Sequence, residues 1–348
     1  MEDAIVILAS ATPSIETRVN AQSGRYGYLR LDRRAGAREM PNLDSIDLRT
    51  NGPKRGQWIA PRLIEEIEEN LSVKQQTLLF LNRRGYAPLT LCRTCGHRFR
   101  CENCDAWLVE HRFRRALICH HCGHTEKRSE NCPECGSLDS LAACGPGVER
   151  LAEEAATLFP QARLLVLSSD FPGGAGRIRR ELDEIAQGNF DLVIGTQLVA
   201  KGHNFPYLTL VGVIDADVGL DNGDPRASER TFQLLSQVTG RAGRGDKPGR
   251  ALLQSYQPNH PVMQALLSGD AEKFYAQEIA LRRRADLPPF GRLAAIIVSA
   301  PDAKIAQNYA RALARLVSEL PKSARYRVAP SDRMAAKDEI TLLGPAEA

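Results

Sequence analysis

The feature that most constrains this 348-residue sequence is a set of four Cys-x-x-Cys pairs between residues 92 and 135. Two thiolates two residues apart can bind one ion from a tight turn, and four complete a closed tetrahedral site. Disulfides are disfavoured because they are rare in cytosolic chains and need no such regular spacing. We therefore predict two structural zinc sites rather than rubredoxin-like iron centres, since no flavin or haem signature accompanies them. The predicted ligands are Cys92, Cys95, Cys101, Cys104, Cys119, Cys122, Cys132 and Cys135.

The pairs can combine sequentially, crossed or nested, and the loop lengths favour nesting. Fourteen residues separate Cys104 from Cys119, close to the roughly 15 to 20 of zinc ribbons. Only five separate Cys95 from Cys101, which is cramped for two turns around one ion. Crossed pairing stays open. Nesting predicts an outer site of Cys92, Cys95, Cys132 and Cys135 and an inner site of Cys101, Cys104, Cys119 and Cys122.

The composition is that of an ordinary globular protein. With 43% hydrophobic and 25% charged residues and a formal net charge of +4, a disordered chain and a histone-like polycation are both excluded. No apolar stretch approaches the roughly 20 residues of a membrane-crossing helix. The acidic start at Glu2 and Asp3 does not fit a secretory signal. We therefore expect a cytoplasmic protein with no membrane partner.

Strand and helix patterns alternate along the chain, which predicts an α/β fold with a parallel sheet covered on both faces. After residue 258 the pattern changes and predicts a small α+β domain. We expect strands at 5–9, 77–81, 163–167, 191–195, 209–215, 251–255 and 293–299. We expect helices at about 61–71, 148–159, 176–187, 225–238 (capped by Asp224), 261–284 and 302–320, with 322–340 as a loop.

Three short motifs stand where strands are expected to end, the edge at which open parallel sheets bind ligands. In the third motif, two guanidinium groups three residues apart could neutralise charge on a transferring phosphoryl group. The alternative is a salt-bridged turn. The motifs are Ser10-Ala11-Thr12, Gly195-Thr196-Gln197 leading to Lys201-Gly202-His203, and Gln237-Val238-Thr239-Gly240-Arg241-Ala242-Gly243-Arg244.

The order of these motifs resembles motifs three, five and six of superfamily-two helicases. The segment from Leu79 to Tyr86, followed at once by the Cys-x-x-Cys pairs, is similar to one family among them, the PriA replication-restart helicases. The similarity continues through Gly145-Pro146-Gly147 and Pro288-Pro289-Phe290-Gly291, and so covers nearly the whole chain. Asn204 departs from the Asp expected after His203, which weakens any charge role at that position.

The resemblance implies a RecA-like second motor lobe with a two-zinc insertion, and 3′-to-5′ ATP-driven unwinding of forked DNA. It also supports the nested pairing of the cysteines. The implied domains are 1–70, the end of the first lobe and a connector; 71–257, the second lobe, interrupted by the zinc module at 92–138; and 258–348, the C-terminal domain.

The resemblance also implies roles for the motif residues. Arg241 and Arg244 would contact the ATP phosphates, and Gln237 would sense the nucleotide. Thr196 and Lys201 would lie near the DNA backbone or the interface between lobes, and Ser10, Ala11 and Thr12 would couple the lobes. The implied cofactors are two Zn²⁺ and ATP with Mg²⁺. The implied partners are forked and single-stranded DNA, primosome proteins, loading factors of the replicative helicase and single-stranded DNA-binding protein.

Two parts of a complete motor are missing from the sequence. It contains no Gly-x-x-x-x-Gly-Lys-Ser/Thr and no Asp-Glu-x-His, the motifs that hold the phosphates and magnesium. We therefore expect the chain to be the C-terminal part of such an enzyme and not to hydrolyse ATP by itself. A non-enzymatic zinc module that binds DNA or a primosome partner is the alternative. Another superfamily-two translocase, such as a branch-migration enzyme, would not explain the four thiolate pairs.

Overall fold

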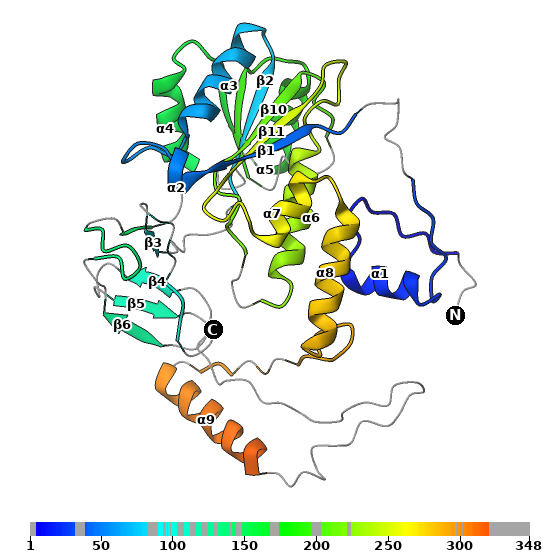
Figure 1. Ribbon diagram of the computed structural model, residues 1–348, viewed down its shortest axis with the longest axis vertical. Helices are drawn as coiled ribbons and strands as arrows, with labels where there is room; N and C mark the ends of the chain where they lie inside the picture. The colour runs from blue at the N-terminus through cyan, green and yellow to red at the C-terminus, as the bar shows by residue number, and fades with distance from the viewer. Residues whose placement is uncertain are drawn as a thin grey trace.

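The centre of the protein is a six-stranded parallel sheet with the order β1-β11-β10-β2-β9-β8, seen in the upper part of the computed structural model (Figure 1). The strands are β1 (Asn42–Asp47), β2 (Gln76–Phe80), β8 (Leu164–Leu167), β9 (Leu192–Gly195), β10 (Leu208–Val213) and β11 (Arg250–Ser255). The structure describes residues 5–31, 39–82, 90–92, 95, 97, 99–102, 108–111, 116–119, 124–127, 131–138, 141–143, 148–167, 174–196, 203–220, 224–294, 296, 298–300 and 302–319. The predicted α/β class and parallel sheet are confirmed.

Helices cover both faces of this sheet. On β2, Leu78 and Phe80 pack into the apolar cluster shared with α5 (Gly174–Ala186) and α6 (Ala227–Thr239). The alternate residue Leu79 packs into a second cluster, shared with α3 (Pro61–Ser72) and α4 (Val148–Leu158). Successive side chains of a strand point to opposite faces, so a continuous apolar run requires cover on both.

Most of the expected elements are found within two residues of the expected bounds, but the N-terminal strand is wrong. Residues 5–10 form no strand, and Ile5, Ile7 and Leu8 are exposed. An apolar run becomes a strand only where a neighbouring strand pairs with its backbone, and none of the described strands does so here. The structure instead contains β1, which pairs in register with β11 from Asn42 opposite Arg250 onward. Its polar sequence gives no strand signal.

The beginning of α6 and the helix expected at 261–284 also differ from the prediction. Asp224 lies before α6, where its Oδ1 accepts the Arg226 N–H at 2.8 Å, and the helix begins at Ala227. The long helix divides into α7 (Pro261–Leu267) and α8 (Ala271–Arg284). Gly269, at φ 65°, makes the break, and Asp270 caps α8 by accepting the Lys273 N–H at 3.2 Å.

Three predictions concern the C-terminal region. The strand expected at 293–299 is not formed by the described residues of that range, because no described strand pairs with them. Ile296 in this segment is 79% exposed. The expected last helix is found as α9 (Ala303–Glu319), which lies apart from the sheet in Figure 1. The loop expected at 322–340 lies outside the described residues.

Among the helices that the structure describes, none combines the length and apolar character needed to cross a membrane.

The Cys-rich insertion begins and ends at one antiparallel strand pair. Thr90 at the start of β3 (Thr90–Cys92) lies opposite Ala143 at the end of β7 (Leu141–Ala143), so the two ends of the insertion are adjacent. Between them is a three-stranded antiparallel sheet. Its strands are β4 (Leu108–His111), β5 (Ala116–Cys119) and β6 (Thr125–Lys127).

Two short helices, α1 (Ile15–Gln22) and α2 (Leu48–Asn51), complete the N-terminal region. β1 is a strand of the six-stranded sheet and α3 packs on it, although β1 and most of α3 fall within residues 1–70. The layer therefore begins before residue 71, and the division of the chain into 1–70, 71–257 and 258–348 stays a prediction.

Candidate functional site

Four cysteine sulfurs come together beside the β3–β7 pair. Cys92 ends β3, and Cys132 and Cys135 approach from a later turn. The four Sγ atoms, including that of Cys95, all lie within 4.8 Å of one another. The Cys92–Cys135 and Cys95–Cys132 separations are both 3.7 Å. Tetrahedral Zn–S bonds of about 2.3 Å place sulfurs about 3.8 Å apart, so this donor set fits zinc.

The backbone folds tightly around these sulfurs. Cys92 donates its N–H to the His97 carbonyl at 2.7 Å, and Cys132 donates its N–H to the Ser137 carbonyl at 3.0 Å. Burial raises the pKa of Cys95 to about 12, whereas the Ser137 hydroxyl lowers the pKa of exposed Cys135. A bound dication offsets the cost of burying thiolates. Zinc held here would cross-link the two turns rather than take part in a reaction.

The sulfurs that meet are those of the outer site in the nested arrangement. Of the inner site, Cys101 is buried and Cys119 ends β5, whereas Cys104 and Cys122 lie outside the described residues. The inner site therefore stays a prediction.

The arginine motif lies at the C-terminal end of α6 and in the turn that follows. Its glycines let this turn pack against the start of β10. Gly243, at φ 68°, donates its N–H to the Leu208 carbonyl at 2.9 Å. A Cβ on Gly245 would lie 2.1 Å from the Pro206 carbonyl oxygen, so no larger residue fits there without a shift of the backbone.

The two guanidinium groups of this turn are held by backbone carbonyls. Arg241 is 5% exposed and donates from Nη1 to the carbonyl of His203. Arg244 is half-buried and donates from Nε to the Gly240 carbonyl at 3.1 Å. Burial, and then the charge of Arg244, lower the pKa of Arg241 to about 10. Because both effects destabilise the cation, an anion bound at this turn would be favoured.

The structure brings the first motif to the third. Thr12 accepts a hydrogen bond at its Oγ1 from the exposed Gln237, Nε2 to Oγ1 3.3 Å. Ser10 Oγ accepts the Thr12 N–H at 3.1 Å, and Ala11 lies exposed between them. The segment from Ser10 to Thr12 therefore lies beside the arginine-bearing end of α6, although more than two hundred residues separate them in sequence.

The middle motif is only partly described. Thr196 is half-buried directly after β9, at the carboxyl end of the sheet. Lys201 lies outside the described residues.

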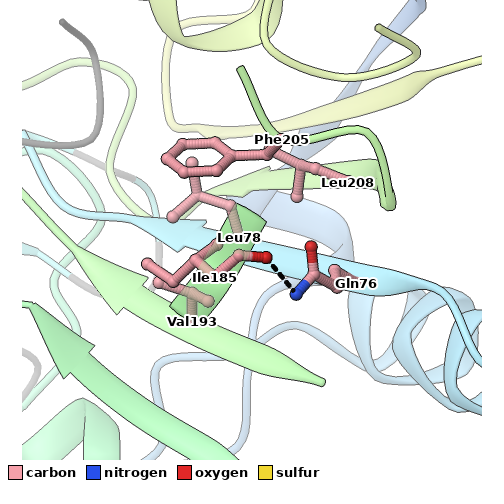
Figure 2. Close-up of a pocket in the computed structure, with 6 residues that line it drawn as sticks. All are labelled: Gln76, Leu78, Ile185, Val193, Phe205 and Leu208. Carbon is pink, nitrogen blue, oxygen red and sulfur yellow. Dashed lines mark hydrogen bonds between the residues drawn. The ribbon is translucent and has the colours of Figure 1, made fainter. Parts of the chain in front are cut away.

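A small hollow between α5 and the sheet is no ligand site. Its lining is apolar apart from Gln76, as Figure 2 shows. Gln76 donates from Nε2 to the carbonyls of Ile185 at 2.9 Å and Phe190 at 2.7 Å, which ties the strand β2 to the end of α5. A binding site needs several convergent polar groups, and this hollow offers one amide, whose nitrogen is engaged with backbone carbonyls.

Sequence analysis missed a buried polar group beside the motifs. Glu229 on α6 and Arg282 on α8 form an ion pair of 2.8 Å in which both side chains are buried. The available signal for Glu229 was its spacing from Gln233 and Gln237, since polar residues that recur every fourth position share one side of a helix.

Comparison with known proteins accounts for the cysteines and the motifs together. The family model of the PriA DNA helicase Cys-rich region matches residues 101–127. The replication restart protein PriA of Rickettsia felis is 45% identical over 336 residues, which is 97% of this chain and 51% of that protein. The chain is thus similar to PriA proteins over nearly its whole length.

Other PriA proteins are also similar. PriA of Bacillus subtilis is 40% identical over 297 residues, 84% of this chain and 36% of that protein. PriA of Haemophilus influenzae is 39% identical over 303 residues, 87% of this chain and 41% of that protein. The chain spans about half the length of the Rickettsia felis protein and less of these two. The solved structure of S. cerevisiae Dbp5 bound to RNA and ADP BeF3 matches with a TM-score of 0.37 and 13% identity, over 76% of this chain and 48% of that one.

Proposed function

We propose that this chain is the C-terminal part of a replication-restart helicase that unwinds forked DNA 3′ to 5′ with the energy of ATP hydrolysis. The observation that carries the proposal is the turn after α6, where buried Arg241 and half-buried Arg244 follow Gln237, the residue that hydrogen-bonds Thr12. Two neighbouring cations, one with a lowered pKa, suit a site where the charge of a transferring phosphoryl group develops. The Cys-rich insertion and the PriA relatives support the same assignment.

In this proposal each motif has a separate role. Arg241 and Arg244 contact the phosphates of ATP-Mg²⁺ held by a first lobe, and Gln237 senses the nucleotide. Ser10, Ala11 and Thr12 couple the lobes, while Thr196 and Lys201 lie near the DNA backbone or the lobe interface. The arrangement of Thr12 beside Gln237 supports a coupling role, because a shift of one side chain reaches the other through one hydrogen bond.

The Cys-rich insertion holds two structural Zn²⁺ ions in the same proposal. The outer site is the four-sulfur cluster of Cys92, Cys95, Cys132 and Cys135, and the inner site is Cys101, Cys104, Cys119 and Cys122. We propose forked and single-stranded DNA as substrates. Primosome proteins, loading factors of the replicative helicase and single-stranded DNA-binding protein are the proposed partners, in the cytoplasm.

A direct test compares arginine variants in a DNA-stimulated ATPase assay. The chain has no P-loop, so we expect no turnover from it alone and measure it with a first lobe supplied from a PriA relative. Arg241→Ala and Arg244→Ala should each lower kcat on the order of 10³-fold, the effect of removing an arginine that stabilises phosphoryl transfer. Arg230→Ala is the matched control, since Arg230 lies on α6 but is exposed and pairs with Asp224.

The alternative function is a zinc-containing module that binds DNA or a primosome protein without a motor. It is favoured by the absence from the sequence of both the phosphate-binding motif and the magnesium-binding motif. In that case Arg241→Ala and Arg244→Ala would change only DNA affinity, and modestly, because the loss of one phosphate contact weakens binding to all DNA sequences alike. ATP turnover by the unsupplemented chain, within tenfold of a complete PriA protein, would overturn the expectation that a first lobe is needed.

A further inference from the structure

One side of α6 carries a polar stripe through an otherwise apolar layer. Glu229, Gln233 and Gln237 recur every fourth residue, and Arg241 continues the spacing in the turn beyond the helix. The opposite side of α6, including Phe232, Leu235 and Val238, is buried in the core. Polar residues at a fixed helical spacing beside a core require fixed partners, because a buried polar group without one is costly.

The partners of the stripe belong to the segment of residues 12–15. Glu229 Oε1 accepts the Ile15 N–H at 3.0 Å. Gln233 Nε2 donates to the Thr12 carbonyl at 3.2 Å, and Gln237 Nε2 donates to Thr12 Oγ1 at 3.3 Å. Side chains of the stripe thus fix the backbone that follows Ser10 and Ala11 along α6.

The inner end of the stripe is anchored from another helix. Arg282 of α8 is 2% exposed and donates to Glu229 Oε2 at 2.8 Å and Glu278 Oε1 at 2.9 Å. The same guanidinium donates to the carbonyls of Pro225 at 3.2 Å and Pro288 at 3.3 Å. A buried cation with this many directed contacts has one geometry, and it therefore fixes the rotamer of Glu229.

The α8 helix also contacts the segment directly. Tyr275 donates its hydroxyl to the Pro13 carbonyl at 2.9 Å. In Figure 1, α1 lies against α8, and Arg18 of α1 forms an ion pair with Glu272 of α8. The segment is therefore held between α6 and α8. Glu229 of α6 accepts the Ile15 N–H, while Arg282 of α8 pairs with Glu229 and also lies 3.8 Å from Glu16 Oε1.

We propose that Arg282 is a positioning residue for the nucleotide site. Through Glu229 it fixes residues 12–15 along the polar stripe, so that Thr12 meets Gln237 four residues before Arg241. This inference rests on the proposed function. It assigns to Arg282 the role of holding the first motif in position relative to the arginines. It assigns α8 to the motor, although α8 falls in the range predicted as the C-terminal domain.

Hydrogen exchange of the 348-residue chain tests the positioning without nucleotide. Arg282→Met should raise the exchange rate in peptides covering residues 13–20 by about tenfold, because the acceptor of the Ile15 N–H is no longer fixed. Peptides of β10 should exchange as in the parent chain. Arg284→Met is the matched control, since Arg284 is exposed two residues further along α8.

Two further variants separate positioning from a general loss of stability. Glu229→Gln keeps the shape of the side chain and removes the charge that Arg282 pairs with, so it should raise exchange in residues 13–20 less than Arg282→Met does. Should Arg282→Met fail to fold, the exchange of residues 13–20 in Glu229→Gln tests the proposal in its place. Arg282→Lys keeps a cation at the position and should retain part of the parental protection of these residues. Equal exchange in the Arg282 and Arg284 variants, or a uniform rise that includes β10, overturns the proposal.

The consequence for the reaction is measured with a first lobe supplied. Arg282→Met should lower the kcat of DNA-stimulated ATP turnover about tenfold and leave the KM for ATP unchanged, as for a group that aligns a transition-state contact. An unchanged kcat overturns the link to the nucleotide site. Absence of turnover in the Arg284→Met control would instead count against the proposed function, while the exchange experiment still decides whether Arg282 positions the segment.

Discussion

The sheet layer and the Cys-rich insertion are stabilised by different means. Each face of the six-stranded sheet has its own large apolar cluster, with fully buried residues such as Phe80 and Leu63. Among the described residues of the insertion there is one small cluster of six buried residues, and three of these are cysteines. Apolar burial thus suffices for the sheet, whereas the insertion has little apolar surface to bury and needs a cross-link.

This difference explains where the two kinds of proposed site lie. The sheet and the helices packed on it bring together groups that are far apart in sequence, since Thr12 bonds to Gln237 of α6 and Arg241 bonds to the His203 carbonyl. In the insertion, the proposed site is a cluster of four cysteine sulfurs that lie within 4.8 Å of one another. Removing metal should therefore affect one region, and removing an apolar side chain should affect the other.

The largest expected effect is that of metal removal. Apparent zinc-binding free energies of about 10–16 kcal/mol supply the folding free energy of small zinc modules. We expect chelation under reducing conditions to abolish hydrogen-exchange protection in β4 and β5 and to leave the sheet strands protected. A metal assay of the untreated chain should return two zinc ions. One or none would remove the nested two-site model.

A cysteine pair of variants controls this experiment. Cys135→Ser removes one of the four clustered sulfurs and should lower the zinc content by one ion. Cys144→Ser removes the one cysteine outside the Cys-x-x-Cys pattern and should leave the zinc content unchanged. Loss of protection throughout the sheet on chelation would show that the two regions are not independently stabilised.

An apolar truncation in the sheet should give the converse result. Phe80 is fully buried on the face shared with α5 and α6. Phe80→Ala should lower the free energy of unfolding by about 3–5 kcal/mol, the transfer and cavity cost of a buried aromatic residue. Urea denaturation measures this loss, and the zinc content should stay at the parental value. A variant that folds with parental stability but loses zinc would contradict the comparison.

The sequence predicts the sheet well because its strands are apolar runs buried on both faces. Residues 77–81 lie within one position of β2, and 251–255 within one position of β11. The edge strand β1 could not be predicted, since it pairs with β11 through backbone groups that every sequence has. The exposed run at residues 5–9 shows the opposite case, in which apolar side chains alone do not make a strand.

The candidate site likewise contains residues that the sequence predicts and residues that it does not. Regular spacing identified the cysteines and the arginine turn, because chemistry at fixed intervals is visible in sequence. Contacts between distant residues were not visible. The ion pair of Glu229 with Arg282 and the hydrogen bond from Ala60 N–H to the side chain of Gln254 at 2.8 Å depend on the packing of whole elements.

The smallest expected effect concerns the ion pair between Arg163, just before β8, and Asp191, just before β9. Hydrogen bonds from Arg163 hold the pKa of Asp191 below its usual range, and Nη2 lies 2.6 Å from Oδ1. A carboxyl with a depressed folded pKa contributes stability above its unfolded pKa of about 4, and loses it as the pH falls through the folded value. Because the Arg163 side chain is 58% exposed, we expect Asp191→Asn to lower the free energy of unfolding by only about 0.5–1 kcal/mol at pH 7.

In urea titrations, the stability gap between Asp191→Asn and the parent chain should be full at neutral pH and should narrow below about pH 4, where the parental carboxyl also becomes protonated. Exposed Asp183→Asn, on α5, is the control and should leave the free energy of unfolding at pH 7 close to that of the parent chain. The expected gap is several-fold smaller than that of Phe80→Ala, because solvent screens an exposed ion pair and does not screen apolar contacts. A gap at pH 7 as large as that of Phe80→Ala would mean that charge, rather than apolar burial, holds β8 against β9.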